Sequence, residues 1–151
     1  MISESPISPE EQEAVLRDVG GGVLAAAPDG WTQLRFRLDV TTELASNRFE
    51  ATMEDGSIVH LSAPDRPRRS LQKLREQMYS PGKGAWFTAR YVIVRPGRYS
   101  VEFDYENEPD FGFEIDALTY ANDLKSFPRD DEHIPDWLRQ KINESEASEE
   151  G

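Results

Sequence analysis

Alternation of apolar and charged side chains in residues 31–40 is the feature that most constrains the fold of this chain. The apolar positions Leu34, Phe36, Leu38 and Val40 lie between Arg35, Arg37 and Asp39. Successive side chains of a β-strand point to opposite faces of the sheet, so this pattern predicts a strand with one buried face. The chain must therefore build a sheet with one apolar face and cover that face with other elements.

Four more segments predict strands, namely residues 49–53, 58–61, 85–94 and 98–105. The dipeptides Asp55-Gly56 and Pro96-Gly97 are turn signals, and each predicts a hairpin between the segments on either side of it. Residues 85–94 form the longest of these segments and are apolar on both faces, which indicates a central strand.

Helices are predicted from about Ser8, at residues 67–79, at residues 115–125 and at residues 134–142. Ser8 can cap the first helix, with Pro9 in the first helical position. The run Gly20-Gly21-Gly22 weakens it by about 1 kcal/mol per glycine relative to alanine, so the helix either breaks there or packs closely against a neighbouring element. Because strands and helices do not alternate regularly, the order predicts an α+β fold. We expect an antiparallel sheet of about five strands with helices packed on one face.

The length of 151 residues suits a single domain. We expect this α+β domain to span residues 1–142. Residues 143–151 are acidic and small and lack apolar anchors, which predicts a disordered acidic tail.

The chain is strongly acidic, with a formal charge of −12 from 29 acidic and 17 basic residues. Such a surface repels phosphate backbones and anionic lipids, so we expect neither nucleic-acid binding nor membrane binding. The local exception is a basic cluster of Arg66, Arg68, Arg69, Lys73 and Arg75. A basic protein partner fits the overall charge better.

The first residues are polar and acidic, unlike a signal peptide, and no apolar stretch approaches the roughly 18 residues that a membrane span needs. The chain has no cysteine, which is compatible with a reducing compartment and excludes thiol catalysis and cysteine-ligated metals. We therefore expect a cytoplasmic protein that is monomeric when free.

Motifs for catalysis are absent from the sequence. The two histidines, His60 and His133, lack a local partner motif such as HExxH, and no serine lies in a G-x-S-x-G context. Neither glycine cluster, at residues 20–22 or 81–84, forms a phosphate-binding loop. We therefore expect no catalytic residue, no metal and no cofactor.

The most distinctive segment is residues 102–116, whose seven carboxylates are Glu102, Asp104, Glu106, Glu108, Asp110, Glu114 and Asp116. Three interpretations compete. A calcium loop would use the 1-3-5 spacing of Asp104, Glu106 and Glu108, but Pro109 replaces the turn glycine of that motif. A pair of carboxylates could hydrolyse a substrate by general acid–base catalysis. Alternatively, the carboxylates form a charged rim around exposed aromatic side chains and dock a basic partner.

An ordered set of residues resembles the YezG-like bacterial immunity proteins. The residues that carry the resemblance are Pro28, Gly30 and Trp31; Trp86; Phe103, Asp104 and Tyr105; Pro109; Tyr120, Asp123, Leu124, Phe127, Pro128 and Arg129; and Ile134, Pro135, Trp137 and Leu138. The resemblance covers roughly residues 28–140 and implies a small cytoplasmic α+β protein that binds and neutralises a cognate secreted toxin. It carries no catalytic residues.

Three hypotheses about function follow. The first is an immunity protein, or antitoxin, that blocks the active site of its toxin. The residues predicted to bind the toxin are Asp104, Tyr105, Glu106, Glu108, Asp110 and Phe111. The alternatives are a type VII-type secretion chaperone or adaptor for an effector and a small hydrolase that uses the carboxylates.

Overall fold

The protein forms one five-stranded antiparallel sheet with helices, and the computed structural model describes residues 7–150. The elements in chain order are α1 (Pro9–Ala25), β1 (Trp31–Val40), β2 (Ala45–Met53), β3 (Ile58–Leu61), α2 (Asp65–Met78), β4 (Thr88–Val94), β5 (Arg98–Asp104), α3 (Ala117–Ser126), the 3₁₀ helix η1 (Asp131–His133) and α4 (Asp136–Glu150). The strand order is β3-β2-β1-β4-β5. The predicted α+β fold, with an antiparallel sheet and helices on one face, is confirmed.

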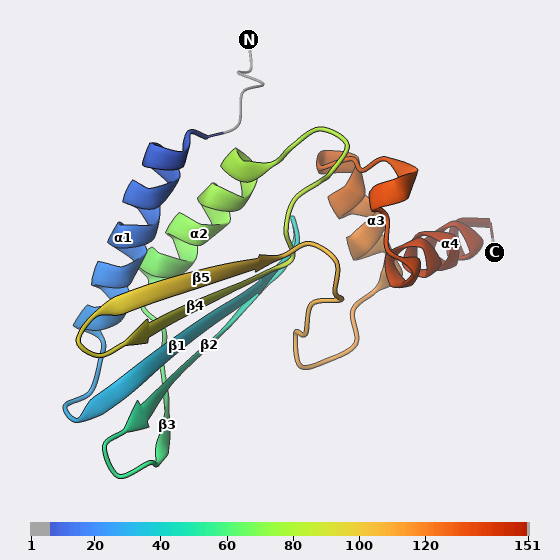
Figure 1. Ribbon diagram of the computed structural model, residues 1–151. Coiled ribbons are helices and arrows are strands. Elements are labelled where there is room, and N and C mark those ends of the chain that lie inside the picture. Colours follow the sequence, from blue (N-terminus) through green and yellow to red (C-terminus); the bar gives the residue numbers. More distant parts are fainter. Residues whose placement is uncertain (1–6, 151) are drawn as a thin grey trace.

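Helices α1 and α2 lie side by side over one face of the sheet (Figure 1). The alternation in β1 explains this arrangement, because Leu34, Phe36 and Leu38 point into the core between the sheet and the two helices. The segment at residues 85–94, predicted to lie centrally, contributes an interior strand, and β1 is the middle strand of the five. That segment forms β4, which lies between β1 and β5.

The glycine run does not break α1, which continues to Ala25. Ser8 caps this helix as predicted, since its Oγ accepts a hydrogen bond from the Glu11 amide at 3.2 Å. Gly20 faces Tyr91 of β4, and a Cβ atom at Gly20 would lie only 2.5 Å from the Tyr91 hydroxyl oxygen. The absence of a side chain therefore lets α1 approach the sheet closely.

Helices α3 and α4 lie beyond one end of the sheet (Figure 1). They enclose a second, smaller core whose buried members are Phe87, Phe111, Ile115, Tyr120 and Leu138. A buried ion pair joins this unit to the first layer, because Arg75 of α2 donates to both carboxylate oxygens of Asp123 of α3 at 3.0 and 2.8 Å. Asp123 also accepts from the Thr42 amide at 2.7 Å, which adds the β1–β2 loop to the junction.

The predicted tail, residues 143–151, begins inside α4, which continues to Glu150. Ser145 is buried, and its hydroxyl donates to the Ile142 carbonyl at 2.9 Å, so this part of the helix packs against the protein. Acidic composition alone did not reveal this, since glutamate and alanine are both good helix formers. The last predicted residue of the tail, Gly151, lies outside the described residues.

Substitution of the α1 glycines is expected to change stability in opposite directions. A Cβ atom at Gly21 would meet nothing beyond its own helix within 4 Å, so Gly21→Ala should raise the free energy of unfolding by about 1 kcal/mol. Gly20→Ala should lower it, because the new methyl group displaces the buried Tyr91 hydroxyl. Urea denaturation measures both effects, and adding Tyr91→Phe to Gly20→Ala should restore part of the loss. Equal effects of the two glycine substitutions would contradict this packing.

Removal of one member of the buried ion pair is expected to be severe. Asp123→Ala leaves Arg75 charged and buried without its partner, which should lower the free energy of unfolding by about 3–5 kcal/mol. The double variant Arg75→Met/Asp123→Ala should lose less than the sum of the two single variants, as measured in a double-mutant cycle by urea denaturation. Additive losses would show that the two charges do not depend on each other.

Candidate functional site

The acidic segment, residues 102–116, begins in β5 and crosses from the end of the sheet to α3 (Figure 1). It has no helix or strand between Asp104 and Ala117. Its shape is therefore set by side-chain contacts at several points along it and not by a continuous backbone ladder.

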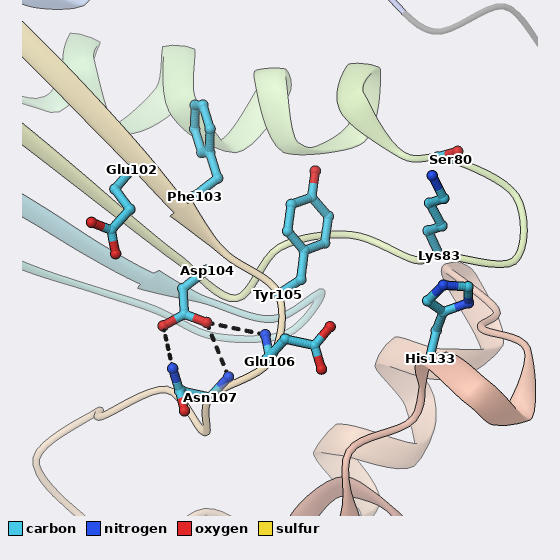
Figure 2. A pocket seen from close by; sticks show the side chains of 9 residues that line it. All are labelled: Ser80, Lys83, Glu102, Phe103, Asp104, Tyr105, Glu106, Asn107 and His133. Carbon is cyan, nitrogen blue, oxygen red and sulfur yellow. Dashed lines mark hydrogen bonds between the residues drawn. The ribbon is translucent and has the colours of Figure 1, made fainter.

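Asp104 organises the turn at the end of β5. Its carboxylate accepts hydrogen bonds from the Glu106 amide at 3.0 Å and from the Asn107 amide and side chain at 3.0 and 2.9 Å (Figure 2). Arg90 lies 3.5 Å away on β4. Burial alone would raise the pKa of Asp104, but the hydrogen bonds from Asn107 and Glu106 and the charge of Arg90 lower it below its usual value. Because its side chain is only 9% exposed, Asp104 acts mainly within the protein.

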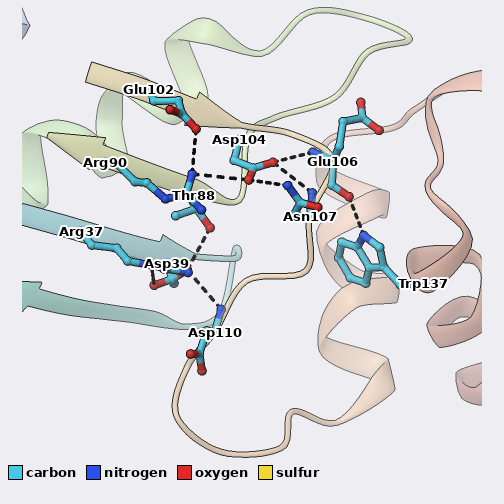
Figure 3. A network of polar contacts seen from close by, with 10 residues as sticks. All are labelled: Arg37, Asp39, Thr88, Arg90, Glu102, Asp104, Glu106, Asn107, Asp110 and Trp137. Carbon is cyan, nitrogen blue, oxygen red and sulfur yellow. Dashed lines mark hydrogen bonds and ion pairs between the residues drawn. The ribbon is translucent and has the colours of Figure 1, made fainter. Parts of the chain in front are cut away.

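A second anchor holds the middle of the segment to the sheet. The buried carboxylate of Asp39 accepts from the Asp110 amide at 3.2 Å, from Thr88 Oγ1 at 2.9 Å and from Arg37 at 2.9 and 3.1 Å (Figure 3). Arg48 of β2 donates to the Asp110 carbonyl at 3.0 Å and lies 2.9 Å from its carboxylate. The hydrogen bond from the Gly112 amide and the charge of Arg48 lower the pKa of Asp110.

Tyr105 and Glu106 lie beside a surface hollow of about 570 Å³ (Figure 2). Lys83 and His133 line its other side. The Glu106 carbonyl accepts a hydrogen bond from Trp137 Nε1 at 2.7 Å, which ties the segment to α4 (Figure 3). Burial raises the pKa of Tyr105, so its hydroxyl stays protonated at neutral pH.

Among the predicted contact residues, Phe111 differs most from the expectation of an exposed aromatic. Its ring is 7% exposed and belongs to the second core, whereas Phe113 is 68% exposed. Glu108 and Asp110 are exposed, as predicted, and line a smaller hollow of about 290 Å³ together with Phe113 and Glu114. The segment thus combines an exposed aromatic ring with carboxylates, and the ring is Phe113. Period-2 or helical spacing could not have distinguished the two phenylalanines, because neither lies in a strand or a helix.

Arg75 of the predicted basic cluster is not available to a partner, since it is buried against Asp123. Arg129, one of the residues that carry the resemblance, donates to the carbonyls of His133 and Ala85 at 2.9 and 3.0 Å. Burial lowers the pKa of Arg129. Both arginines satisfy backbone carbonyls at the junction between the two cores, since Arg75 Nε also donates to the Trp86 carbonyl.

Within residues 7–150, the group whose donor atoms lie close enough to share a cation consists of Asp130, Glu132 and His133, all within 4.8 Å of one another. Asp130 and Glu132 are solvent-exposed, and such acidic groups are common at protein surfaces without a metal. The calcium-loop residues Asp104, Glu106 and Glu108 do not form such a group in this part of the chain. In the turn, Asp104 Oδ1 accepts from the amides of Glu106 and Asn107, and Oδ2 accepts from the Asn107 side chain.

No protein-family model matches the sequence, and a search of curated proteins finds no significant relative. Membership of the YezG-like family therefore stays a prediction from the residues quoted above. In the described part of the chain, no helix has both the length and the apolar character required to cross a membrane.

Acidification is expected to detach the acidic segment from the sheet. A carboxylate with a lowered folded-state pKa stabilises the fold above its unfolded pKa of about 3.9, and this contribution is lost as pH falls through the folded value. The amide signals of Asn107 and Gly112, which donate to Asp104 and Asp110, should stay constant from pH 7 to about 5 and shift below about 4. Two-dimensional NMR measures this, and Asp110→Asn should remove the Gly112 transition alone. A transition already complete above pH 5 would contradict the lowered pKa values.

Proposed function

We propose that the protein is an immunity protein that binds a secreted toxin domain and blocks it, and that it has no catalytic activity of its own. The observation that carries the proposal is the exposed ring of Phe113 within a segment of exposed carboxylates. The resemblance to YezG-like immunity proteins supports the toxin as the partner. A toxin with a basic, partly apolar surface fits this combination.

Phe113 is suited to anchor such a partner. It is the most exposed large apolar side chain of the described residues, and its neighbours Glu108, Glu114 and Asp116 are exposed carboxylates. An aromatic side chain that enters a pocket of the partner supplies much of the binding energy of an interface. Carboxylates around it increase the association rate with a basic surface and contribute less to affinity.

The state of Asp104 supports binding over hydrolysis. A carboxyl group that acts as a general acid near neutral pH needs a raised pKa, usually through burial without hydrogen-bond donors. The pKa of Asp104 is lowered, and its oxygens already accept from Glu106 and Asn107. The hollow beside it therefore offers a poor environment for acid catalysis by this residue.

The proposal is tested by co-expression in a bacterial host with the toxin domain encoded beside this gene. Cells that express the toxin should grow only when the protein is present. If the two proteins form a complex while the toxin stays fully active, the secretion chaperone or adaptor is the better interpretation. If neither binding nor protection occurs, the proposal fails.

The residue-level prediction concerns Phe113 and a matched control. Phe113→Ala should weaken toxin binding by about 2 kcal/mol or more, and it should change the free energy of unfolding by less than about 0.5 kcal/mol. Leu24→Ala removes an exposed apolar side chain from α1, far along the chain from the segment, and should leave binding unchanged. Titration calorimetry measures the affinities, and urea denaturation measures the stabilities.

Phe111→Ala serves as the contrasting variant. Because Phe111 is buried in the second core, its removal should lower the free energy of unfolding by about 3–5 kcal/mol. A variant of Phe113 that is as unstable as the Phe111 variant, or one that binds the toxin normally, would contradict the assignment of Phe113 as the anchor.

A further inference from the structure

The smaller hollow beside Phe113 has a buried tyrosine in its lining. Tyr120 of α3 lines this hollow of about 290 Å³, although the residue is only 1% exposed. Its ring is held by edge-to-face contacts with Phe87 and Trp137 in the second core. Tyr120 is therefore a fixed part of the floor of the hollow.

The hydroxyl of Tyr120 makes no hydrogen bond within residues 7–150, whereas buried hydroxyls are normally paired. It is also not among the unpaired side-chain atoms of these residues that are sealed from solvent, so it opens into the hollow. Burial raises the pKa of Tyr120, and the nearby charge of Glu108 raises it further, so the hydroxyl stays protonated at neutral pH. A polar group that enters the hollow would satisfy it.

The lining of the hollow keeps two negative charges. Its charged members are Glu108, Asp110, Glu114 and Lys141. Asp110 pairs with Arg48 at 2.9 Å, and Lys141 lies 4.0 Å from Glu144. Within the described part of the chain, Glu108 and Glu114 are exposed and form no ion pair of their own. Their charges therefore remain available to a cation from outside.

The spacing of the carboxylates favours a guanidinium over a metal ion. Among residues 7–150, Glu108, Asp110 and Glu114 do not form a group whose oxygens all lie within 4.8 Å of one another, as three ligands of one metal ion would. A guanidinium is larger, and its five N–H donors reach acceptors on different sides. Its flat face also stacks on aromatic rings. Phe113 supplies such a ring, which is 68% exposed and lines the same hollow.

We propose that the hollow beside Phe113 binds an arginine side chain of the partner protein. The guanidinium stacks on the Phe113 ring. At the rim it donates to the carboxylates of Glu108 and Glu114, and at the floor it donates to the Tyr120 oxygen. This inference rests on the proposed function for the identity of the partner, since the toxin supplies the arginine. It assigns a single ligand group to the exposed ring, the unpaired carboxylates and the unpaired hydroxyl.

The test is a titration of the ¹⁵N-labelled protein with Nα-acetyl-arginine methylamide, observed by NMR. The corresponding citrulline derivative is the control of similar shape without the charge, and the lysine derivative carries the charge without the planar group. The arginine probe should shift the amide signals of Gly112, Phe113 and Glu114. Its dissociation constant should be on the order of 1 mM, as expected for a ligand of this size, and binding should weaken as salt rises to about 0.2 M.

Variants assign the binding to the hollow. Tyr120→Phe removes only the hydroxyl and should weaken binding of the arginine probe about three- to tenfold. Glu108→Gln should weaken it about threefold. The matched control is Glu102→Gln, which removes an exposed carboxylate that lines the other hollow and should leave the affinity unchanged. If Tyr120→Phe disturbs the second core, Glu108→Gln decides, since Glu108 is exposed.

Three outcomes would overturn the proposal. An arginine probe that leaves the signals unchanged would mean that the Tyr120 hydroxyl binds water alone. Equal binding of the citrulline or lysine derivative would mean that the hollow does not recognise a guanidinium. Calcium chloride that shifts the same signals at a lower concentration than the arginine probe would assign the carboxylates to a metal ion.

Co-expression with the toxin separates this inference from the proposed function. A protein that protects cells but does not bind the arginine probe keeps the proposed function and loses this inference. A protein that binds the probe but gives no protection keeps the arginine site and loses the toxin as its partner.

Discussion

The ion pair between Arg75 and Asp123 is the interaction on which the arrangement of the whole molecule depends. Both side chains are 3% exposed, so neither charge is compensated by water. This pair joins α2 to α3. The amide of Thr42, in the β1–β2 loop, donates to Asp123, and Arg75 donates to the carbonyl of Trp86, which lies just before β4. The guanidinium also lies over the rings of Phe87 and Phe127, at 5.6 and 5.0 Å from their centroids. A buried pair of this kind is expensive to break but need not add net stability, so its main effect is to fix how the two cores meet.

That junction determines where the acidic segment is displayed. Because α3 and α4 lie beyond the end of the sheet, the chain crosses from β5 to α3 past the ends of the strands (Figure 1). Asp104 holds the near end of this crossing through the Glu106 amide, and Trp137 of α4 holds it through the Glu106 carbonyl. Asp39 holds the middle of the crossing through the Asp110 amide. Phe111, next to Asp110, and Ile115, just before α3, anchor the rest of the crossing in the second core. Phe113 lies between these two residues in the chain, and its ring is left outside.

Local patterns predicted the elements well, and tertiary contacts explain where they did not. The alternation in residues 31–40, the Ser8 cap and the Asp55-Gly56 turn each depend on neighbouring residues alone, and the structure has them where predicted. The neighbours of β4, which are β1 and β5, depend on strand order, and the composition of the strand does not encode that order. The continuation of α4 to Glu150 includes the buried Ser145, and burial is a tertiary contact that the acidic composition of this segment does not indicate. The cross-strand neighbours Arg37, Arg48 and Arg90 could not be grouped without the register of three strands, since they have no common spacing in sequence.

Arg48 connects the backbone that presents Phe113 to the sheet. Its guanidinium lies 2.9 Å from the Asp110 carboxylate and donates to the Asp110 carbonyl at 3.0 Å. The same carboxylate accepts from the Gly112 amide, immediately before Phe113. Because one carboxylate bridges a side chain of β2 and the backbone beside Phe113, the loss of its negative charge weakens both contacts together, and Phe113 is then held in place by Phe111 and Ile115 in the second core.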